Sequence, residues 1–204
     1  GAFGQIEYSK NKVAAFASLS LSNTSYKRID YFNYLDSDSL QETDGYNFFG
    51  YSIKGGLNYN INNNHTLFAN LGYFEKAPGF NSVFLNFDNE HINEDAENQK
   101  ITSYELGYKF RSEKFAANVN LYSTQWKDRT LTRSFQNSDG TFSAANILGV
   151  NALHTGIELD FVYKASDKLS LSGMASFGDW TWQNDLTDIQ IFDEQQNLIQ
   201  TINL

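Results

Sequence analysis

The feature that most constrains this chain is an alternation of apolar and polar residues, sustained over segments of about ten residues. In the stretch FAANVNLYSTQW, one phase holds Phe115, Ala117, Val119 and Leu121, and the other holds Ala116, Asn118, Asn120 and Thr124. A period of two predicts a strand with one apolar and one polar face. A soluble protein buries the apolar face in a core, whereas an outer-membrane barrel turns it toward lipid and its polar face toward the lumen.

The alternation recurs in eight segments, which we expect to be strands at residues 3–8, 12–22, 49–59, 66–76, 99–110, 115–127, 152–163 and 169–183. Four short connections centred on Asn11, Asn63, Glu113 and Ser166 are 52, 50 and 53 residues apart. Longer polar segments separate them, at 36–47, 78–98 and 128–151 and in the tail from residue 185. This order predicts four hairpins with short turns at one rim and long loops at the other.

Three properties of the strands favour a membrane barrel. The polar phases are rich in Ser, Asn and Gly, whereas the outer face of a soluble sheet usually carries Lys and Glu. The segments are long, because soluble strands average about 5 to 6 residues and membrane strands need about 9 to 11. Aromatic residues mark strand ends, as in an aromatic girdle at the lipid headgroups: Tyr59, Tyr73, Tyr108, Phe110, Trp126 and Tyr163.

Composition excludes several functional classes. The 204 residues include no cysteine, so no disulfide or zinc-thiolate site is expected. The net charge of -9 argues against a nucleic-acid partner. Aromatic residues make up 16% of the chain and proline occurs once, which favours strands. The longest apolar runs are about as short as VAAFA, far below the roughly 20 residues of a transmembrane helix.

We therefore predict an all-β fold, an antiparallel transmembrane β-barrel. Eight strands could close a small barrel by themselves. The end of the chain, DIQIFDEQQNLIQTINL, is instead typical of a loop or hairpin that extends the last strand. An open sheet would leave unpaired edges in lipid, so the eight strands are expected to be one arc of a larger barrel.

With these hairpins placed, the sequence resembles the β-barrel of TonB-dependent outer-membrane receptors, particularly those of Bacteroidota. Five ordered stretches carry the resemblance: GAFGQIEYS, LSNTSYKRIDYFNY, GGLNYNINNNHTLFANLGYFEKAPGF, NQKITSYELGYKFRSEKFAANVNLYSTQWKDR and HTGIELDFVYKASDKLSLSGMASFGDWTWQND. The resemblance implies a barrel of about 22 strands around an N-terminal plug domain. Residues 1–204 would then be a partial barrel domain of about eight strands, without the plug and the remaining strands.

Metal and catalytic sites are not expected. Residues 88–97, DNEHINEDAE, and the acidic run 36–45 lack the spacing of an EF-hand and suit solvated loops. No nucleophile elbow, phosphate-binding glycine loop or HExxH helix is present, so the chain is not expected to be an enzyme or to need a cofactor. His154 and Glu158 share the polar phase and are expected to contact the plug as part of the wall.

The ligand-binding candidates lie beside the long-loop rim. Trp180 and Trp182 share one face of a strand, where they could stack on an aromatic siderophore or a sugar, or serve as girdle anchors. Arg129 and Arg133, with Lys127, follow Trp126 and could attract an anionic ferric chelate. The alternative role of these cations is contact with lipopolysaccharide phosphates or plain solvation.

The favoured functional hypothesis follows from the resemblance. It implies a receptor in the outer membrane of a Gram-negative bacterium that binds a large, scarce nutrient, first of all a ferric siderophore. The implied partners are outer-membrane lipid and lipopolysaccharide, the plug, the TonB–ExbB–ExbD complex and the nutrient, with no nucleic acid. The alternatives are a passive porin or small structural barrel, and a soluble carbohydrate-binding β-protein, which the weakly charged polar phase disfavours.

Overall fold

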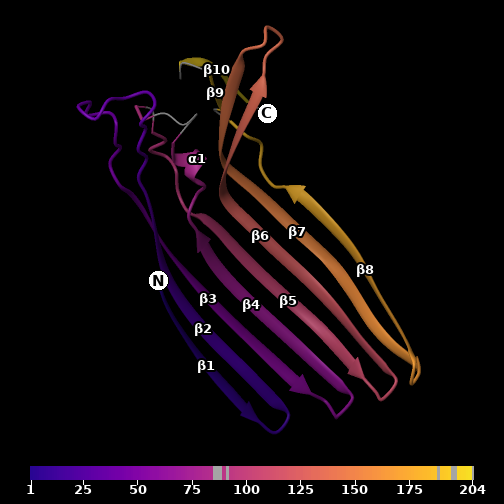
Figure 1. The fold of residues 1–204 in the computed structure, drawn as a ribbon. Coiled ribbons are helices and arrows are strands. Elements are labelled where there is room, and N and C mark those ends of the chain that lie inside the picture. The colour runs from indigo at the N-terminus through magenta and orange to yellow at the C-terminus, as the bar shows by residue number, and fades with distance from the viewer. Residues whose placement is uncertain (85–88, 91, 188, 194–196, 204) are drawn as a thin grey trace.

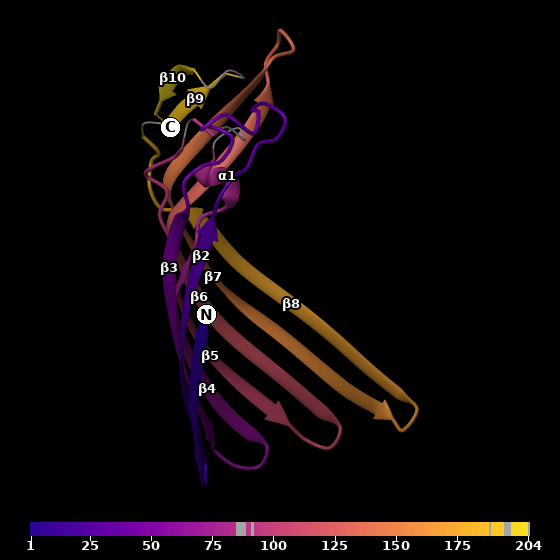
Figure 2. The same ribbon diagram turned by 60° about the vertical axis from the view of Figure 1, so that its left-hand side comes forward.

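Ten antiparallel strands form one open, curved sheet (Figures 1 and 2). The computed structural model describes residues 1–84, 89–90, 92–187, 189–193 and 197–203. The strands are β1 (Ala2–Lys10), β2 (Val13–Tyr26), β3 (Tyr46–Asn60), β4 (His65–Lys76), β5 (Gln99–Arg111), β6 (Phe115–Gln136), β7 (Phe142–Ser166), β8 (Leu169–Trp182), β9 (Ile189–Phe192) and β10 (Leu198–Ile202). A short helix, α1 (Phe80–Val83), lies in the β4–β5 connection. In the described part of the chain, no helix is long and apolar enough to span a membrane.

The four predicted hairpins and their short turns are confirmed. Strands β1 to β7 pair in sequence order, and β8 pairs with the part of β7 nearest the short turns. The pairing is continuous over long stretches, for example 14 consecutive pairs between β2 and β3 from Val13–Tyr59 to Tyr26–Tyr46. All short turns lie at one end of the sheet and the long connections at the other (Figure 1).

The register keeps the two phases on opposite faces throughout. Residues that pair across strands share a face, and pairing joins apolar residues to apolar ones: Leu106 to Leu121, Leu121 to Ile157, Val119 to Leu159 and Ala117 to Phe161. The other face joins Lys109 to Asn118, Asn118 to Asp160 and Asn120 to Glu158. A slip of one residue would exchange the two faces, so this pairing is strongly specified.

Within the described residues, the apolar face of the sheet has no protein partner. Leu106 is 56% exposed and Leu121 is 48% exposed, although both lie in the middle of the sheet. The fully buried apolar side chains Val83 and Phe84 lie instead in the β4–β5 connection. A contiguous apolar surface of this extent requires a nonpolar environment, which lipid supplies.

Glycines on the polar face make room for aromatic rings that lie flat on the sheet. A Cβ atom on Gly107 would stand 2.0 Å from Cζ of Phe68, its cross-strand partner. A Cβ on Gly56 would stand 2.3 Å from Cε1 of Phe16, and one on Gly156 would stand 2.6 Å from the Tyr122 hydroxyl. The small residues of this phase therefore serve packing within the wall.

The prediction of a long loop at residues 128–151 is wrong, because most of this segment is strand. β6 continues to Gln136 and β7 begins at Phe142, so the two strands project beyond the sheet as a hairpin arm (Figure 1). The polar residues at 127–129 mark a β-bulge, where pairing shifts between Trp126 and Arg129 and Asp128 adopts a φ of 57°. Beyond the membrane the arm has no lipid to face, so its sequence need not alternate.

The tail also departs from the expectation that it extends the last strand. It forms the hairpin β9–β10, but β9 pairs with β7 at Ala144–Asn146 and makes no extension of β8. β7 has 25 residues, and beyond Ala152, the last residue that pairs with β8, its edge is open to β9. The sheet therefore has ten strands where the sequence predicted eight.

Residues 1–204 by themselves should not form a soluble monomer. The edges β1, β8 and β10 offer unpaired backbone groups, and the apolar face is uncovered. We expect aggregation on transfer from denaturant into detergent-free buffer, measured by light scattering and size-exclusion chromatography. A monodisperse, detergent-free monomer with a cooperative thermal transition would contradict the membrane assignment.

Candidate functional site

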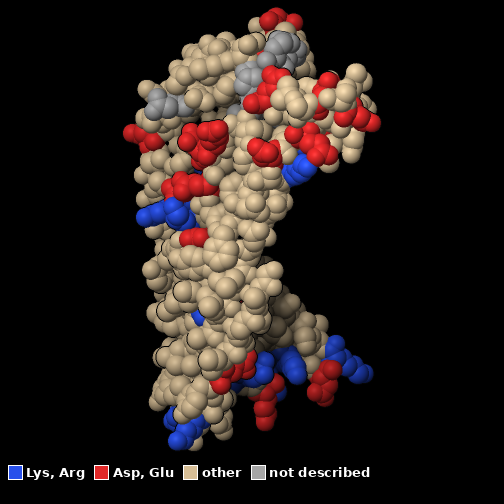
Figure 3. Space-filling view, turned by 90° about the vertical axis from the view of Figure 1, so that its left-hand side faces the viewer, with Lys and Arg blue, Asp and Glu red and all other residues tan. Residues whose placement is uncertain are grey.

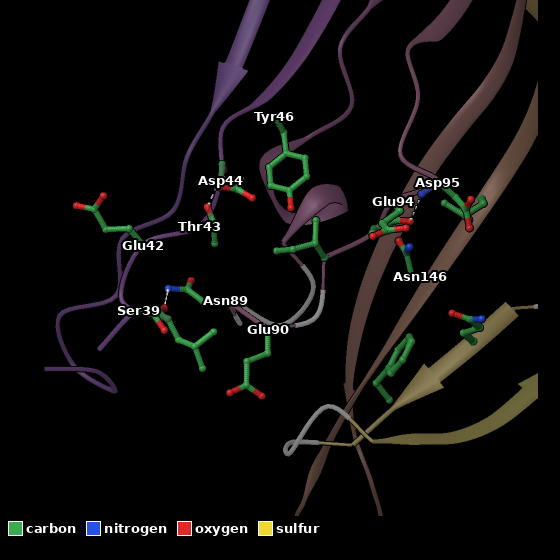
Figure 4. Close-up of a pocket in the computed structure, with 16 residues that line it drawn as sticks. Ser39, Glu42, Thr43, Asp44, Tyr46, Asn89, Glu90, Glu94, Asp95 and Asn146 are labelled. Atoms are coloured by element: carbon green, nitrogen blue, oxygen red, sulfur yellow. Dashed lines mark hydrogen bonds between the residues drawn. The ribbon is translucent and has the colours of Figure 1, made fainter. Parts of the chain in front are cut away.

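A cavity of about 810 Å³ opens among the long connections at the upper end of the sheet (Figure 4). It is lined by the β2–β3 connection with the first residue of β3, the β4–β5 connection, the arm and β9: Ser39, Leu40, Glu42, Thr43, Asp44, Tyr46, Asn89, Glu90, Ile92, Asn93, Glu94, Asp95, Asn146, Leu148, Gln190 and Phe192. These four segments are far apart in the sequence. A concave site that converges from several loops on a rigid sheet is typical of ligand binding.

Hydrogen bonds fix two of these connections to each other. The Asn89 amide donates to the carbonyl oxygens of Leu40 at 2.7 Å and Gln41 at 2.9 Å. The Arg28 guanidinium donates to the Asn89 side-chain oxygen and pairs with the Asp30 carboxylate at 3.0 Å. The cavity wall formed by residues 39–46 is therefore held in place by a residue of the β4–β5 connection.

The buried Asp30 carboxylate organises the base of the β2–β3 connection. It accepts hydrogen bonds from the backbone and side chain of Asn33, the backbone of Phe32 and the guanidinium of Arg28. Bonds to the charged form, those from Asn33 above all, hold the pKa of Asp30 well below its ordinary value. This carboxylate is thus a structural anion and is not available to a ligand.

The cavity itself is acidic. Glu42, Asp44, Glu90, Glu94 and Asp95 line it, and its described lining includes no Lys or Arg. Burial, followed by the charges of Asp44 and Glu94, raises the pKa of Tyr46. Such a field favours neutral or cationic ligands over anionic ones. Within the described residues, no group of three or more His, Cys, Asp or Glu side chains is arranged to hold a metal ion.

A cluster of aromatic side chains lies below the arm, on the polar face of β6 to β8. Trp180 Nε1 donates to the Tyr122 hydroxyl at 3.2 Å, and the His154 ring lies 5.5 Å from that of Trp180. On the same face, Ala152 lies between Trp126 and Trp182. Trp180 and Trp182 are 69% and 64% exposed. We call these five aromatic residues, Tyr122, Trp126, His154, Trp180 and Trp182, the aromatic cluster.

The comparison with known families gives a match along almost the whole chain. The family model described as TonB dependent receptor-like, beta-barrel, matches residues 1–201. The chain belongs to this family. The solved structure of a protein named copper transporter OprC is similar, with a TM-score of 0.70 and 18% identity over 93% of this chain. The chain spans 30% of that structure's chain. No curated protein matches the sequence.

The register of the sheet decides whether the tryptophans can be girdle anchors. A girdle residue must lie on the lipid-facing apolar face, but the register puts Trp126, Trp180 and Trp182 on the polar face. The girdle assignment of Trp126 is therefore wrong. The parity of Trp126 relative to Asn118 and Asn120, in the same strand, already indicates this face in the sequence.

The four ligand-binding candidates that the sequence suggested do not form one site. Arg129 lies opposite Val150, with its guanidinium carbon 5.0 Å from the centre of the Trp126 ring, and so joins the aromatic cluster. Arg133 lies opposite Ala145 on the arm and is exposed. None of the four is among the described residues that line the cavity. His154 and Glu158 lie on the polar face, as the sequence predicted.

The cavity includes residues that the sequence did not single out. Asn89, Asn146 and Gln190 come together only through the fold, and single amides in polar segments carry no distinguishing signal. The acidic segment considered for a metal, residues 88–97, contributes Glu90, Glu94 and Asp95, while Asp88 and His91 lie outside the described residues.

Proposed function

We propose that this chain is one arc of a larger outer-membrane barrel that binds a large, scarce nutrient and imports it with energy supplied through TonB. The observation that carries the proposal is the position of the cavity, at the long-loop end of a receptor-barrel sheet and lined by four separate segments. The family is one of outer-membrane receptors and transporters. The proposed partners are a plug domain within the barrel, the TonB–ExbB–ExbD complex, and the surrounding lipid and lipopolysaccharide. We propose no catalytic role.

The ligand class that we propose is a ferric siderophore. The aromatic cluster offers exposed ring faces for stacking, and the cavity above it offers amides and carboxylates. Because five carboxylates line the cavity, a ferric chelate without net negative charge suits it better than an anionic chelate. Arg129 and Arg133 would act below and beside the cavity, through the aromatic cluster and the arm.

The double substitution of Trp180→Ala and Trp182→Ala should weaken ligand binding and uptake by the full-length receptor about tenfold, a loss of about 1.4 kcal/mol. The expected cause is loss of the exposed ring faces on β8. Binding is measured with radiolabelled ferric siderophore on whole cells. Assembly, measured by heat-modifiable gel mobility, should not change.

The matched control rewrites the short turn at residues 111–114, which has too few side chains to form a pocket. We expect this variant to bind and assemble normally. If the turn variant lost binding while assembling normally, and the tryptophan variant kept it, the long-loop rim would not be the binding side.

A further inference from the structure

Each strand that descends to a short turn carries a tyrosine on the apolar face within three residues of its end. Tyr8, Tyr59, Tyr108 and Tyr163 come from β1, β3, β5 and β7, and each pairs across the sheet with an apolar residue: Tyr8 with Ala15, Tyr59 with Leu67, Tyr108 with Val119, and Tyr163 with Phe115. Their exposed fractions are 36% to 56%. The four side chains therefore form a row along the outer surface at the level of the short turns.

The same end of the sheet is strongly basic. We define the short-turn rim as residues 8–14, 59–66, 109–116 and 163–170. It contains seven Lys and Arg residues against two acidic residues, a net charge of +5 in a chain of net charge -9, so the rest of the chain carries -14. Figure 3 shows Lys and Arg interspersed with some Asp and Glu at this lower end, and mostly Asp and Glu at the upper end.

The cations of the short-turn rim lack carboxylate partners. All seven are exposed, and among the described residues none of them forms an ion pair: Lys10, Lys12, Lys109, Arg111, Lys114, Lys164 and Lys168. At the other end, Lys27 pairs with Glu42, and Lys100 pairs with Glu97 and Asp128. Because the seven groups are exposed and no described carboxylate neutralises them, the rim can offer its positive charge to an external partner.

We propose that the short-turn rim binds the phosphate headgroups of anionic phospholipids. The tyrosine row belongs to the face that contacts lipid, where amphipathic rings lie at headgroup level. Lysines of the adjoining turns reach the same level, and each adds attraction to an anionic leaflet. An acidic protein would complement the charge but would give no role to tyrosines on the lipid-facing surface.

Three lysines are best placed for this contact because they lie in the turns themselves. Lys12, Lys114 and Lys168 stand between the paired strands, beside the row of tyrosines. Lys109, by contrast, lies over the Phe68 ring on the polar face, with its Nζ 4.5 Å from the ring centre, and points away from lipid. The Lys12 ammonium also donates to the carbonyl oxygen of Ile61 at 2.7 Å, which fixes it near Tyr59.

The test uses the full-length receptor in detergent, incubated with equal amounts of phosphatidylglycerol and phosphatidylcholine and analysed by native mass spectrometry. We expect about tenfold more bound phosphatidylglycerol, falling to about twofold in the triple variant Lys12→Gln, Lys114→Gln, Lys168→Gln. The matched control, Lys27→Gln, Lys76→Gln, Lys127→Gln, removes the same charge near the long-loop end and should keep the preference.

Added salt should lower the preference of the unaltered receptor, a result that needs no variant to fold. No preference in the unaltered receptor, an unchanged preference in the folded triple variant, or an equal loss in the control would overturn the proposal. Retention of lipopolysaccharide in place of phosphatidylglycerol would overturn the assignment to phospholipid. Lipid binding is measured without ligand or TonB, so the transport proposal can fail independently.

Discussion

Leu121→Arg should lower the free energy of unfolding of the full-length receptor in lipid by about 2 to 4 kcal/mol. Leu121 lies near the middle of the membrane part of β6, between Leu106 and Ile157, and its side chain is exposed on the apolar face. A guanidinium there must leave water for hydrocarbon or distort the bilayer to reach it. The measurement is equilibrium unfolding by guanidinium chloride in phospholipid vesicles, followed by tryptophan fluorescence.

Asn120→Arg is the matched control, one residue away at nearly the same depth. Asn120 lies on the polar face, opposite Gly107 and Glu158, where an arginine can pair with the Glu158 carboxylate. We expect this variant to unfold within about 0.5 kcal/mol of the parent protein. Equal losses in the two variants would mean that the two faces have been assigned to the wrong environments.

Gly107→Ala should cost about 1 to 3 kcal/mol, although it adds a single methyl group. The new Cβ would stand 2.0 Å from the Phe68 ring, which is 9% exposed and packed between Gly107 and the Lys109 ammonium. The ring must leave its position, losing its contact with the sheet and the lysine. The measurement is the same unfolding transition.

A double-mutant cycle identifies the cause. If the clash with Phe68 explains the loss, Gly107→Ala should cost much less in a Phe68→Ala background, so the two changes should be strongly non-additive. Gly55→Ala is the control, because the nearest heavy atom to its Cβ would be 3.7 Å away. Additive losses at positions 68 and 107 would show that the ring does not occupy the space above Gly107.

The membrane part of the sheet could be predicted from the sequence because lipid imposes one rule on every strand. Residues such as Leu106, Leu121 and Leu159 must face hydrocarbon, so the period of two persists from one short turn to the next. The same rule fixed the face of Trp180 and Trp182, whose parity matches that of Ser170 and Ser172 in the same segment. Position at a strand end does not determine the face, so the expectation that Trp126 is a girdle residue is wrong.

Above the membrane no hydrocarbon imposes an alternation of apolar and polar residues. The sequence therefore did not predict the arm or the pairing of the tail. The arm is strand from Arg129 to Gln136 without a lipid-facing phase, and the bulge at Asp128 gave it the appearance of a loop. The pairing of β9 with β7 depends on the edge of β7 that β8 leaves unpaired beyond Ala152. No local sequence pattern indicates this edge.

The sequence by itself determined the eight membrane strands, the short turns, the two faces and the family, since each depends on residues close together in the chain or on a pattern repeated along it. Only the tertiary structure decided which distant side chains meet. The cavity joins the β2–β3 connection to the β4–β5 connection through Asn89, and the aromatic cluster joins Tyr122 to Trp180 across 58 residues. Such contacts follow from register and loop packing, whose energies are sums over many long-range pairs that single residues do not reveal.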